Sequence, residues 1–361
     1  MPGHDIMVVG TSAGGVEALT YLVKNLPPDI KAAILIVLHV PSHGTSVLPR
    51  ILKRVGNLPA SHAQDGEAIL AGKIYVAPPN YHLLVKKGYI NLTCGPRENS
   101  HRPAIDPLFR TAARAYGRRV VGVILTGVLD DGTAGLKAVK MRGGVAIVQN
   151  PNDAMYAGMP SSAIENVDDI DYVLPLAEIP ALLVELANTL VEEKENCVVP
   201  EEIKYESDIA ELDMEAINND DRPGKPSGFV CPECGGSLWE LQQGDLLRFR
   251  CRTGHAYSAE TLLAEQSDAL EDALWIAMRA LQEKSSLGHR MAKRMRDRNQ
   301  ILSAERLEQE ARDCDERAAV IREVLLKTNR HALAELNELP NQEEQQVDIS
   351  DNYQSLYVTS S

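Results

Sequence analysis

Short apolar runs alternate with helix-length segments through the first 190 residues, and this alternation restricts the fold more than any other feature of the chain. The runs are rich in Val and Ile and do not alternate with polar residues, so each fits a strand that is buried on both faces. Strands of this kind, separated by helices, are typical of a parallel sheet covered on both sides. We therefore predict a doubly wound, mostly parallel α/β domain over residues 1–191.

Six strands and five helices are expected in this domain. The strands are Ile6–Val9, Ala33–Val40, Ile74–Ala77, Val120–Leu125, Val145–Gln149 and Tyr172–Leu174. The helices are Gly15–Asn25, Val47–Arg54, Ile105–Tyr116, Ala134–Met141 and Ile179–Leu190. His82–Thr93 carries Lys86-Lys87-Gly88 at its centre and is typical of a β-hairpin, which we expect to add antiparallel strands to the sheet.

Negative charge is concentrated in two segments outside the predicted domain. The formal net charge of the chain is −14, of which −10 falls in residues 192–221 and −6 in residues 331–361. The rest is close to neutral, which argues against a main domain that binds nucleic acid. We interpret residues 192–227 as an acidic linker with a short helix around Ile209–Ile217, and residues 331–361 as an acidic, disordered tail.

The apolar runs are also too short for a membrane protein. The longest, Ala32–Val40 and Val120–Leu129, cannot cross a bilayer, and the N-terminus lacks a basic and apolar leader. We therefore expect a soluble, cytoplasmic protein without membrane insertion.

Three cysteines and one histidine in residues 228–258 have the spacing of a metal site. Cys231 and Cys234 form a CxxC pair, and 16 residues separate it from a CxxxH pair, Cys251 and His255. Two tight turns at the ends of a β-hairpin bring four such ligands together around tetrahedral zinc. We predict a zinc-ribbon-like module with structural zinc in a reducing compartment, the alternative being a former ribbon that no longer binds metal.

Residues 259–330 contain no proline and are expected to be helical. Apolar residues recur there at spacings of 4, 3 and 4, as in a coiled-coil seam, at Leu270, Leu274, Ala277 and Leu281. We expect a long helix, or a helical hairpin that bends near Gly288. Three roles remain open: a dimer seam, a dock for a signalling partner, and an amphipathic pair that folds against the ribbon.

A small-residue turn, Gly10-Thr11-Ser12-Ala13-Gly14-Gly15, follows the first strand and opens a helix. A serine in such a turn stands at the carboxyl edge of the sheet beside helix N-terminal amides, which suits a nucleophile whose product is an oxyanion. The alternatives are a nucleotide-binding turn and a turn that is merely tight. The segment lacks the third glycine of the dinucleotide fingerprint and the Gly-Lys-Ser/Thr ending of a P-loop.

A histidine and two aspartates end two further strands. His39 closes the second strand, and Asp130 and Asp131 follow Val120–Leu125 in a glycine-rich turn. Because parallel strands point the same way, these residues lie on the edge that carries Ser12. Serine, histidine and aspartate are the parts of a hydrolytic triad. The alternatives are a structural histidine and helix-capping aspartates, and one carboxylate can cap while the other orients the ring.

Five motifs, in order, make the first 190 residues similar to the catalytic domain of the CheB family, the chemotaxis protein-glutamate methylesterases. They are the Gly10–Gly15 turn, Leu38-His39, His101–Asp106, the Thr126–Gly135 turn, and Gln149-Asn150 with Gly158–Pro160. The resemblance implies a doubly wound, mostly parallel sheet. It assigns Ser12 as the nucleophile, His39 as general base and then acid, and Asp131 as the orienting carboxylate.

The resemblance also implies the reaction and its partner. The chain would be a serine hydrolase that demethylates glutamate methyl esters on a chemoreceptor or other sensor protein, releases methanol, and can also deamidate glutamine. No cofactor is implied for catalysis. A non-catalytic signalling scaffold that keeps the fold as a binding platform is the alternative, and the intact Ser12, His39 and Asp131 argue against it.

Four residues are expected to contact the substrate or its oxyanion. They are Thr11, Ala13, Val128 and Arg102, with the amides of Ala13 and Val128 as oxyanion donors. Arg102 could steer an acidic receptor segment, and an ion pair with Asp106 is the structural alternative.

Overall fold

The computed structural model describes residues 3–41, 44–191, 198–218, 223–243 and 246–338. The chain divides into two compact units, Met1–Gln266 and Ser267–Ser361. Within the described part of the chain, none of the helices combines the length and the hydrophobicity that spanning a bilayer requires.

Seven parallel strands form the central sheet of the first unit, in the order β3-β4-β2-β1-β7-β8-β9. Their bounds are β1 Ile6–Thr11, β2 Ala33–Leu38, β3 Ala60–His62, β4 Ile74–Val76, β7 Val120–Ile124, β8 Val145–Gln149 and β9 Tyr172–Leu174. The chain leaves β1 toward β2 and later returns to β7 on the other side of β1. This doubly wound order confirms the predicted fold class.

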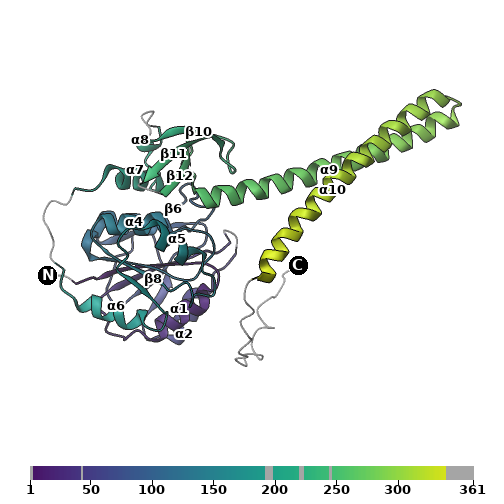
Figure 1. Ribbon diagram of the computed structural model, residues 1–361. Helices are drawn as coiled ribbons and strands as arrows, with labels where there is room; N and C mark the ends of the chain where they lie inside the picture. The colour runs from purple at the N-terminus through teal and green to yellow at the C-terminus, as the bar shows by residue number, and fades with distance from the viewer. Residues whose placement is uncertain (1–2, 42–43, 192–197, 219–222, 244–245, 339–361) are drawn as a thin grey trace. The chain divides into compact units, whose positions relative to one another are not determined.

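Helices cover both faces of the sheet (Figure 1). On one face lie α1 Gly15–Lys24, α2 Leu48–Val55 and α6 Ile179–Asn188. On the other lie α3 Ile105–Tyr116, which the short 3-10 helix Gly117–Arg119 follows, α4 Thr133–Met141 and α5 Gly158–Asn166. Ile6 and Val8 pack into one apolar core and Met7 and Val9 into the other, which explains why the strands carry no polar alternation.

Besides the 3-10 helix, one strand and one α-helix of this domain were missed by the sequence analysis. β3 is a three-residue edge strand whose residues are only partly buried, so it lacks an apolar run. α5 begins with Gly-Met-Pro and has no clear helical period. The other predicted strands of the sheet and the predicted helices are confirmed, and their ends differ from the predicted ones by at most two residues.

The predicted hairpin is confirmed as β5 His82–Lys86 and β6 Tyr89–Thr93. It forms a separate two-stranded sheet, so the expectation that it adds antiparallel strands to the main sheet was wrong. The reason lies in α3, which packs against β5, and whose Thr111 Oγ1 accepts a hydrogen bond from Val85 N at 3.0 Å. This side of β5 is therefore covered by a helix.

The acidic segment expected to be a linker is partly folded. α7 Glu201–Ala210 and α8 Met214–Asn218 take the place of the single helix expected around Ile209–Ile217. α7 packs on α3 and buries Ile203 in the core beneath it. Residues 192–197 and 219–222 lie outside the described residues.

The cysteine-rich segment folds into a four-stranded antiparallel sheet, which we call the ribbon. Its strands are β10 Lys225–Val230, β11 Ser237–Gln243, β12 Leu246–Cys251 and β13 Ala256–Ser258. The predicted hairpin corresponds to β11 and β12, whereas β10 and β13 were not predicted. Residues 244–245 lie outside the described residues.

A helical hairpin follows, made of α9 Ala259–Asp297 and α10 Ile301–Glu338. The expected bend near Gly288 was wrong, because the chain turns only after Asp297. Gly288 lies within α9, and its missing side chain lets Ala311 of α10 approach. The expected tail is helical as far as Glu338, and residues 339–361 lie outside the described residues.

Candidate active site

The three residues predicted as a triad follow three neighbouring strands of the sheet. Ser12 follows β1, His39 follows β2, and Asp131 lies in the turn after β7, with β1 between the other two strands. His39 N donates to Thr11 O at 3.2 Å, and Ser12 N donates to Thr126 O at 3.1 Å. These bonds extend the ladders past the strand ends and hold the three turns together.

The imidazole of His39 lies between Ser12 and Asp131. Its Nδ1 is 3.1 Å from Ser12 Oγ, and its Nε2 is 2.7 Å from Asp131 Oδ2. The serine hydroxyl can therefore donate to Nδ1 while Nε2–H donates to the carboxylate. The two ring nitrogens are exchanged relative to the chymotrypsin arrangement, where Nε2 faces the serine. Either nitrogen can accept a proton when the other carries one.

The carboxylate of Asp131 is held from several sides. Besides His39, four donors bond to it: Ile105 N at 2.7 Å, Asn99 Nδ2 at 2.9 Å, Gly132 N at 3.0 Å and Asp106 N at 3.3 Å. Burial alone would raise the pKa of Asp131, but the hydrogen bond and charge of His39 and the Ile105 amide hold it below its ordinary range. Asp131 therefore stays ionised, and it caps α3 as well as orienting the histidine.

Asp130 bonds to a different part of the chain. Its carboxylate accepts hydrogen bonds from Ser258 Oγ at 2.7 Å and Thr261 Oγ1 at 3.0 Å. Burial raises the pKa of Asp130 to about 6, although the hydrogen bonds from the two hydroxyl groups act in the opposite direction. The two adjacent aspartates thus separate by position: one faces His39, and the other fastens the end of the ribbon and the start of α9.

Two glycines allow the turns to meet. Gly14 has a φ of +73°, a conformation that side chains with a Cβ rarely adopt. A Cβ at Gly127 would lie 2.1 Å from Met159 Sδ and 3.0 Å from Ser12 Cβ. The turn after β7 can therefore approach the serine only because this residue is glycine.

Ser12 and His39 open onto a cleft of about 510 Å³. The cleft is lined by Ser12, Ala13, His39, Val40, Pro41, Arg97, Ser100, His101 and Arg102. Its size is within the range of ligand pockets, and it is open enough to admit a side chain of a protein substrate.

His101 is a cleft residue to which the sequence analysis gave no role. Its ring stacks on that of His39, with centroids 3.6 Å apart and an interplanar angle of 17°. Burial, together with the charge of His39, lowers the pKa of His101 to about 4, so the ring is neutral at pH 7. Nδ1–H donates to Asn99 O. The motif His101–Asp106 contained this residue, but a ring stack between distant segments leaves no local sequence signal.

The residues expected to contact the substrate have different positions. Ala13 lines the cleft, and its amide bonds to no acceptor among the described residues. Thr11 was expected there, but its side chain is fully buried and its hydroxyl donates to Thr126 O at 2.7 Å, so it does not line the cleft. Val128 is 47% exposed and is not among the cleft residues.

Arg102 lines the cleft, but structural bonds occupy most of its guanidinium. Nη1 donates to Cys94 O and Gly95 O, at 3.1 and 2.8 Å, and both Nε and Nη2 donate to Asn80 Oδ1. The alternative ion pair with Asp106 was wrong, since this guanidinium bonds elsewhere. The side-chain amide of Asn80 and the two backbone carbonyl groups hold Arg102 at the wall of the cleft.

The four predicted metal ligands converge in the ribbon, with their ligand atoms all within 4.8 Å of one another. Cys234 Sγ is 3.7 Å from Cys251 Sγ, and His255 Nδ1 is 3.5 Å from Cys251 Sγ and 3.7 Å from Cys231 Sγ. Tetrahedral zinc separates such ligands by about 3.5 to 3.8 Å, so the residues fit the ion. His255 Nε2 lies 2.9 Å from the Glu233 carboxylate, a partner that orients a metal-binding histidine.

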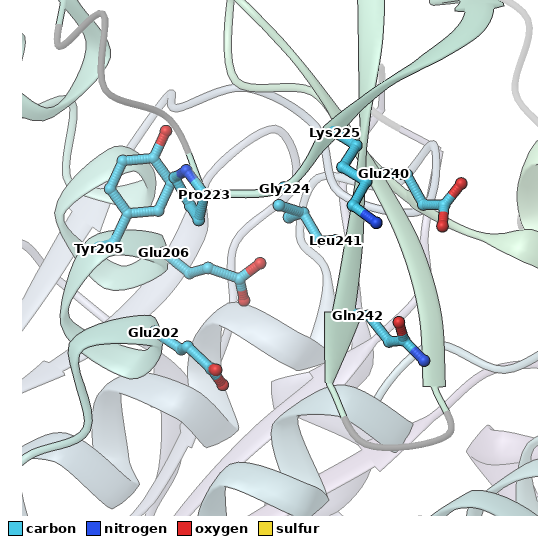
Figure 2. A pocket seen from close by; sticks show the side chains of 9 residues that line it. All are labelled: Glu202, Tyr205, Glu206, Pro223, Gly224, Lys225, Glu240, Leu241 and Gln242. Carbon is cyan, nitrogen blue, oxygen red and sulfur yellow. The ribbon is translucent and has the colours of Figure 1, made fainter.

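A second cavity, of about 280 Å³, lies between α7 and the strands β10 and β11. Figure 2 shows Glu206 reaching into it from α7, and its lining is Glu202, Tyr205, Glu206, Pro223, Gly224, Lys225, Glu240, Leu241 and Gln242. These residues include no nucleophile beside a base. The cleft at Ser12 is therefore the candidate active site.

Known proteins resemble the first half of this chain. Residues 7–183 match the family model described as CheB methylesterase. A putative protein-glutamate methylesterase/protein-glutamine glutaminase of Leptospira interrogans is 41% identical over 192 residues, which are 53% of this chain and 99% of that protein. A protein-glutamate methylesterase/protein-glutamine glutaminase of Pyrococcus horikoshii is 37% identical over 188 residues, 51% of this chain and 51% of that protein.

Among solved structures, the crystal structure of the Thermotoga maritima CheB methylesterase catalytic domain is 37% identical, with a TM-score of 0.49. The match covers 50% of this chain and 98% of that one. The family model and the Leptospira relative, matched over nearly its whole length, decide the assignment. The chain belongs to the CheB methylesterase family.

Proposed function

We propose that this chain is a serine hydrolase that demethylates glutamate methyl esters on a chemoreceptor-like signalling protein and releases methanol. The observation that carries the proposal is the placement of His39 between Ser12 and Asp131, at 3.1 and 2.7 Å. The names of the relatives add deamidation of glutamine, which uses the same acyl chemistry. We assign the reaction to the cytoplasm, because a Cys/His cluster that binds metal needs reduced cysteines, as in a reducing compartment.

The mechanism follows from the donors and acceptors of the triad. His39 Nδ1 takes the proton of Ser12 as Oγ attacks the ester carbonyl, and Asp131 stabilises the imidazolium through Nε2–H. The amide of Ala13, beside the N-terminus of α1, is our oxyanion donor, with Val128 as the second. His39 then protonates the methoxide, which is too basic to leave alone, and water hydrolyses the acyl enzyme.

Ser12→Ala is expected to lower methanol release by at least about 10³-fold, because the acyl enzyme cannot form. The probe is a peptide that carries a glutamate γ-methyl ester, and the assay measures methanol. Ser61→Ala, on the edge strand β3, is the matched control and should retain wild-type release. Equal release by wild type and Ser12→Ala would refute the esterase and favour a non-catalytic scaffold.

We also propose that Cys231, Cys234, Cys251 and His255 hold a structural zinc ion. The ligand distances and the Glu233 partner of His255 support this assignment. Four protein ligands complete the tetrahedron and leave no position for a reactive water, so the ion would stabilise the ribbon and take no part in hydrolysis.

The purified full chain is therefore expected to contain about one zinc ion per molecule after dialysis, measured by plasma mass spectrometry. Cys234→Ser should lose most of this zinc. Cys94→Ser changes an exposed thiol outside the cluster and should retain it. The same zinc content in both variants, or no metal in the wild type, would contradict the zinc site and favour a ribbon held by its apolar residues.

A further inference from the structure

The loop of residues 97–101 connects the catalytic histidine and aspartate to the ribbon. On the triad side, Asn99 Nδ2 donates to Asp131 Oδ1 at 2.9 Å, and the ring of His101 stacks on His39. Two of the three triad residues are thus contacted by this one loop. Any displacement of the loop changes the surroundings of both.

On the other side, the same loop pairs with the last strand of the ribbon. Asn99 N donates to Ala256 O at 2.8 Å, and Ala256 N donates to Arg97 O at 3.2 Å. Ser258 N donates to Asn99 Oδ1 at 2.9 Å. Two of these three hydrogen bonds join backbone to backbone, so the loop is held like a strand against β13, and the third uses the Asn99 side chain.

The amide of Asn99 can adopt only one orientation in this position. Its side chain is 98% buried, its NH₂ group donates to Asp131 and to Asp106 Oδ2 at 3.1 Å, and its oxygen accepts from Ser258. A flipped amide would direct its oxygen at two carboxylates and its NH₂ at a backbone N–H. The Asn99 side chain thus joins the ribbon to the triad through hydrogen bonds in one fixed orientation.

The loop needs external support, because its backbone is unfavourable. Asn99 and Ser100 have φ values of +49° and +63°, and neither is glycine. Consecutive residues in the left-handed region persist only where surrounding contacts over-determine them. On the ribbon side, the hydrogen bonds with β13 provide this support.

Buried charges fasten the ribbon to the residue that precedes Asn99. Arg250 on β12 reaches Glu98 Oε1 at 3.2 Å and Glu206 Oε1 at 3.3 Å, and Arg110 on α3 reaches the same Glu98 oxygen at 2.7 Å. All four side chains are at least 96% buried. The position of Glu98, and so of the loop, depends on a guanidinium from the ribbon.

We propose that the ribbon is a positioning element of the active site, acting through Asn99, which holds Asp131 in line with His39. Asn99 does not touch the reacting atoms, so it is a positioning residue. This inference rests on the proposed hydrolase function and deepens it. The ribbon lies outside residues 7–183, which match the family model, and the inference gives it a role in the geometry of the triad.

The test measures the reactivity of Ser12 without a methylated substrate. A fluorophosphonate reacts with an activated serine: Oγ bonds to phosphorus, the P–F bond breaks, fluoride leaves, and the serine proton passes to the histidine. Asn99→Ala in the full chain is expected to lower the maximal inactivation rate by roughly 10- to 100-fold. The half-saturating probe concentration should change by less than about twofold, because the cleft that binds the probe is retained.

Asn188→Ala is the matched control. Its side chain lies on the surface at the end of α6, where Nδ2 donates to Val184 O, and the inactivation rate should equal that of the wild type. A melting curve of each variant identifies those that are folded. An inactivation rate of folded Asn99→Ala within twofold of the wild type would overturn the proposal.

Arg250→Lys tests the ribbon side independently. Lysine keeps the charge but cannot reach Glu98, Glu206 and Gly254 O together, as the guanidinium does. A smaller fall in the same rate is expected, and Arg54→Lys, exposed on α2, should cause none. The Asn99→Ala/Arg250→Lys double variant should be no slower than Asn99→Ala, because both act through one amide. Fully multiplicative effects would overturn the proposed route.

The two proposals fail in different ways. A wild-type protein that is not labelled at Ser12 would refute the hydrolase function itself. A wild-type protein that is labelled, together with Asn99→Ala and Arg250→Lys that are labelled equally fast, would leave the function intact and refute only the positioning role of the ribbon.

Discussion

Asp131→Asn is expected to lower the turnover number for methanol release about 10⁴-fold, the loss that the corresponding change causes in a Ser-His-Asp protease. Asparagine has nearly the same volume, so the buried site can retain its shape. If its NH₂ group faces His39, the imidazole must carry its proton on Nδ1 and can no longer accept the proton of Ser12. If its oxygen faces His39, the imidazolium loses the negative charge that stabilises it.

The neighbouring aspartate provides the control for this prediction. Asp130→Asn makes the same chemical change one residue away, where the carboxylate accepts from Ser258 and Thr261 and not from His39. Its loss of turnover should be less than about tenfold, a ratio of more than about 10³ between the two variants. Equal losses in both, with melting temperatures unchanged, would show that Asp131 does not orient the histidine.

The residue pattern alone could not distinguish these two aspartates, and only the resemblance to the CheB family selected Asp131. Strand order and direction can be expected from apolar runs, and parallel strands necessarily bring Ser12, His39 and the Asp130-Asp131 pair to one edge. Which carboxylate faces the ring depends on the backbone path within the turn after β7. That path is set by contacts with α3, whose first amides bond to Asp131.

The packing of the ribbon on the catalytic domain was beyond prediction for a different reason. Arg248 and Arg250 lie in a strand that was expected to be part of an independent small module, where arginines are usually exposed. In the structure both are buried, because they pair with Glu98 and Glu206. A local sequence pattern cannot reveal which charged residues form ion pairs with residues more than forty positions away. Without these ion pairs, the acidic segment that contains Glu206 resembled a linker.

Glu206→Gln is expected to lower the free energy of unfolding of the first unit by about 3–5 kcal/mol. Glu206 accepts from Arg248 at 2.7 Å and contacts Arg110 and Arg250 at 3.2 and 3.3 Å, all in the protein interior. Without the charge of Glu206, the three buried guanidinium groups keep Glu98 as their shared carboxylate partner, which does not balance their positive charge. The expected fall in melting temperature is on the order of 10 °C.

A fluorescence probe and a control variant make the unfolding measurement on Glu206→Gln specific to the ribbon. The chain has two tryptophans, so in a Trp275→Phe background the fluorescence of Trp239 on β11 reports unfolding of the ribbon alone. Glu202→Gln changes an exposed glutamate on the same helix and should cost less than about 0.5 kcal/mol. Similar unfolding curves for the two variants would show that the ion network does not fasten the ribbon.

The pH dependence provides an independent check on the same charge. Burial alone would raise the pKa of Glu206, but Arg248, Arg110 and Arg250 outweigh it and hold the pKa well below its ordinary value. A carboxyl group whose pKa is lowered by folding contributes full stability above its unfolded-state pKa, about 4.3, and loses it as the pH falls toward the folded value. The difference in unfolding free energy between wild type and Glu206→Gln should therefore be constant from pH 6 to 8 and narrow below about pH 4. A difference that does not change with acidification would mean that the charge of Glu206 is not what stabilises the contact between α7 and the ribbon.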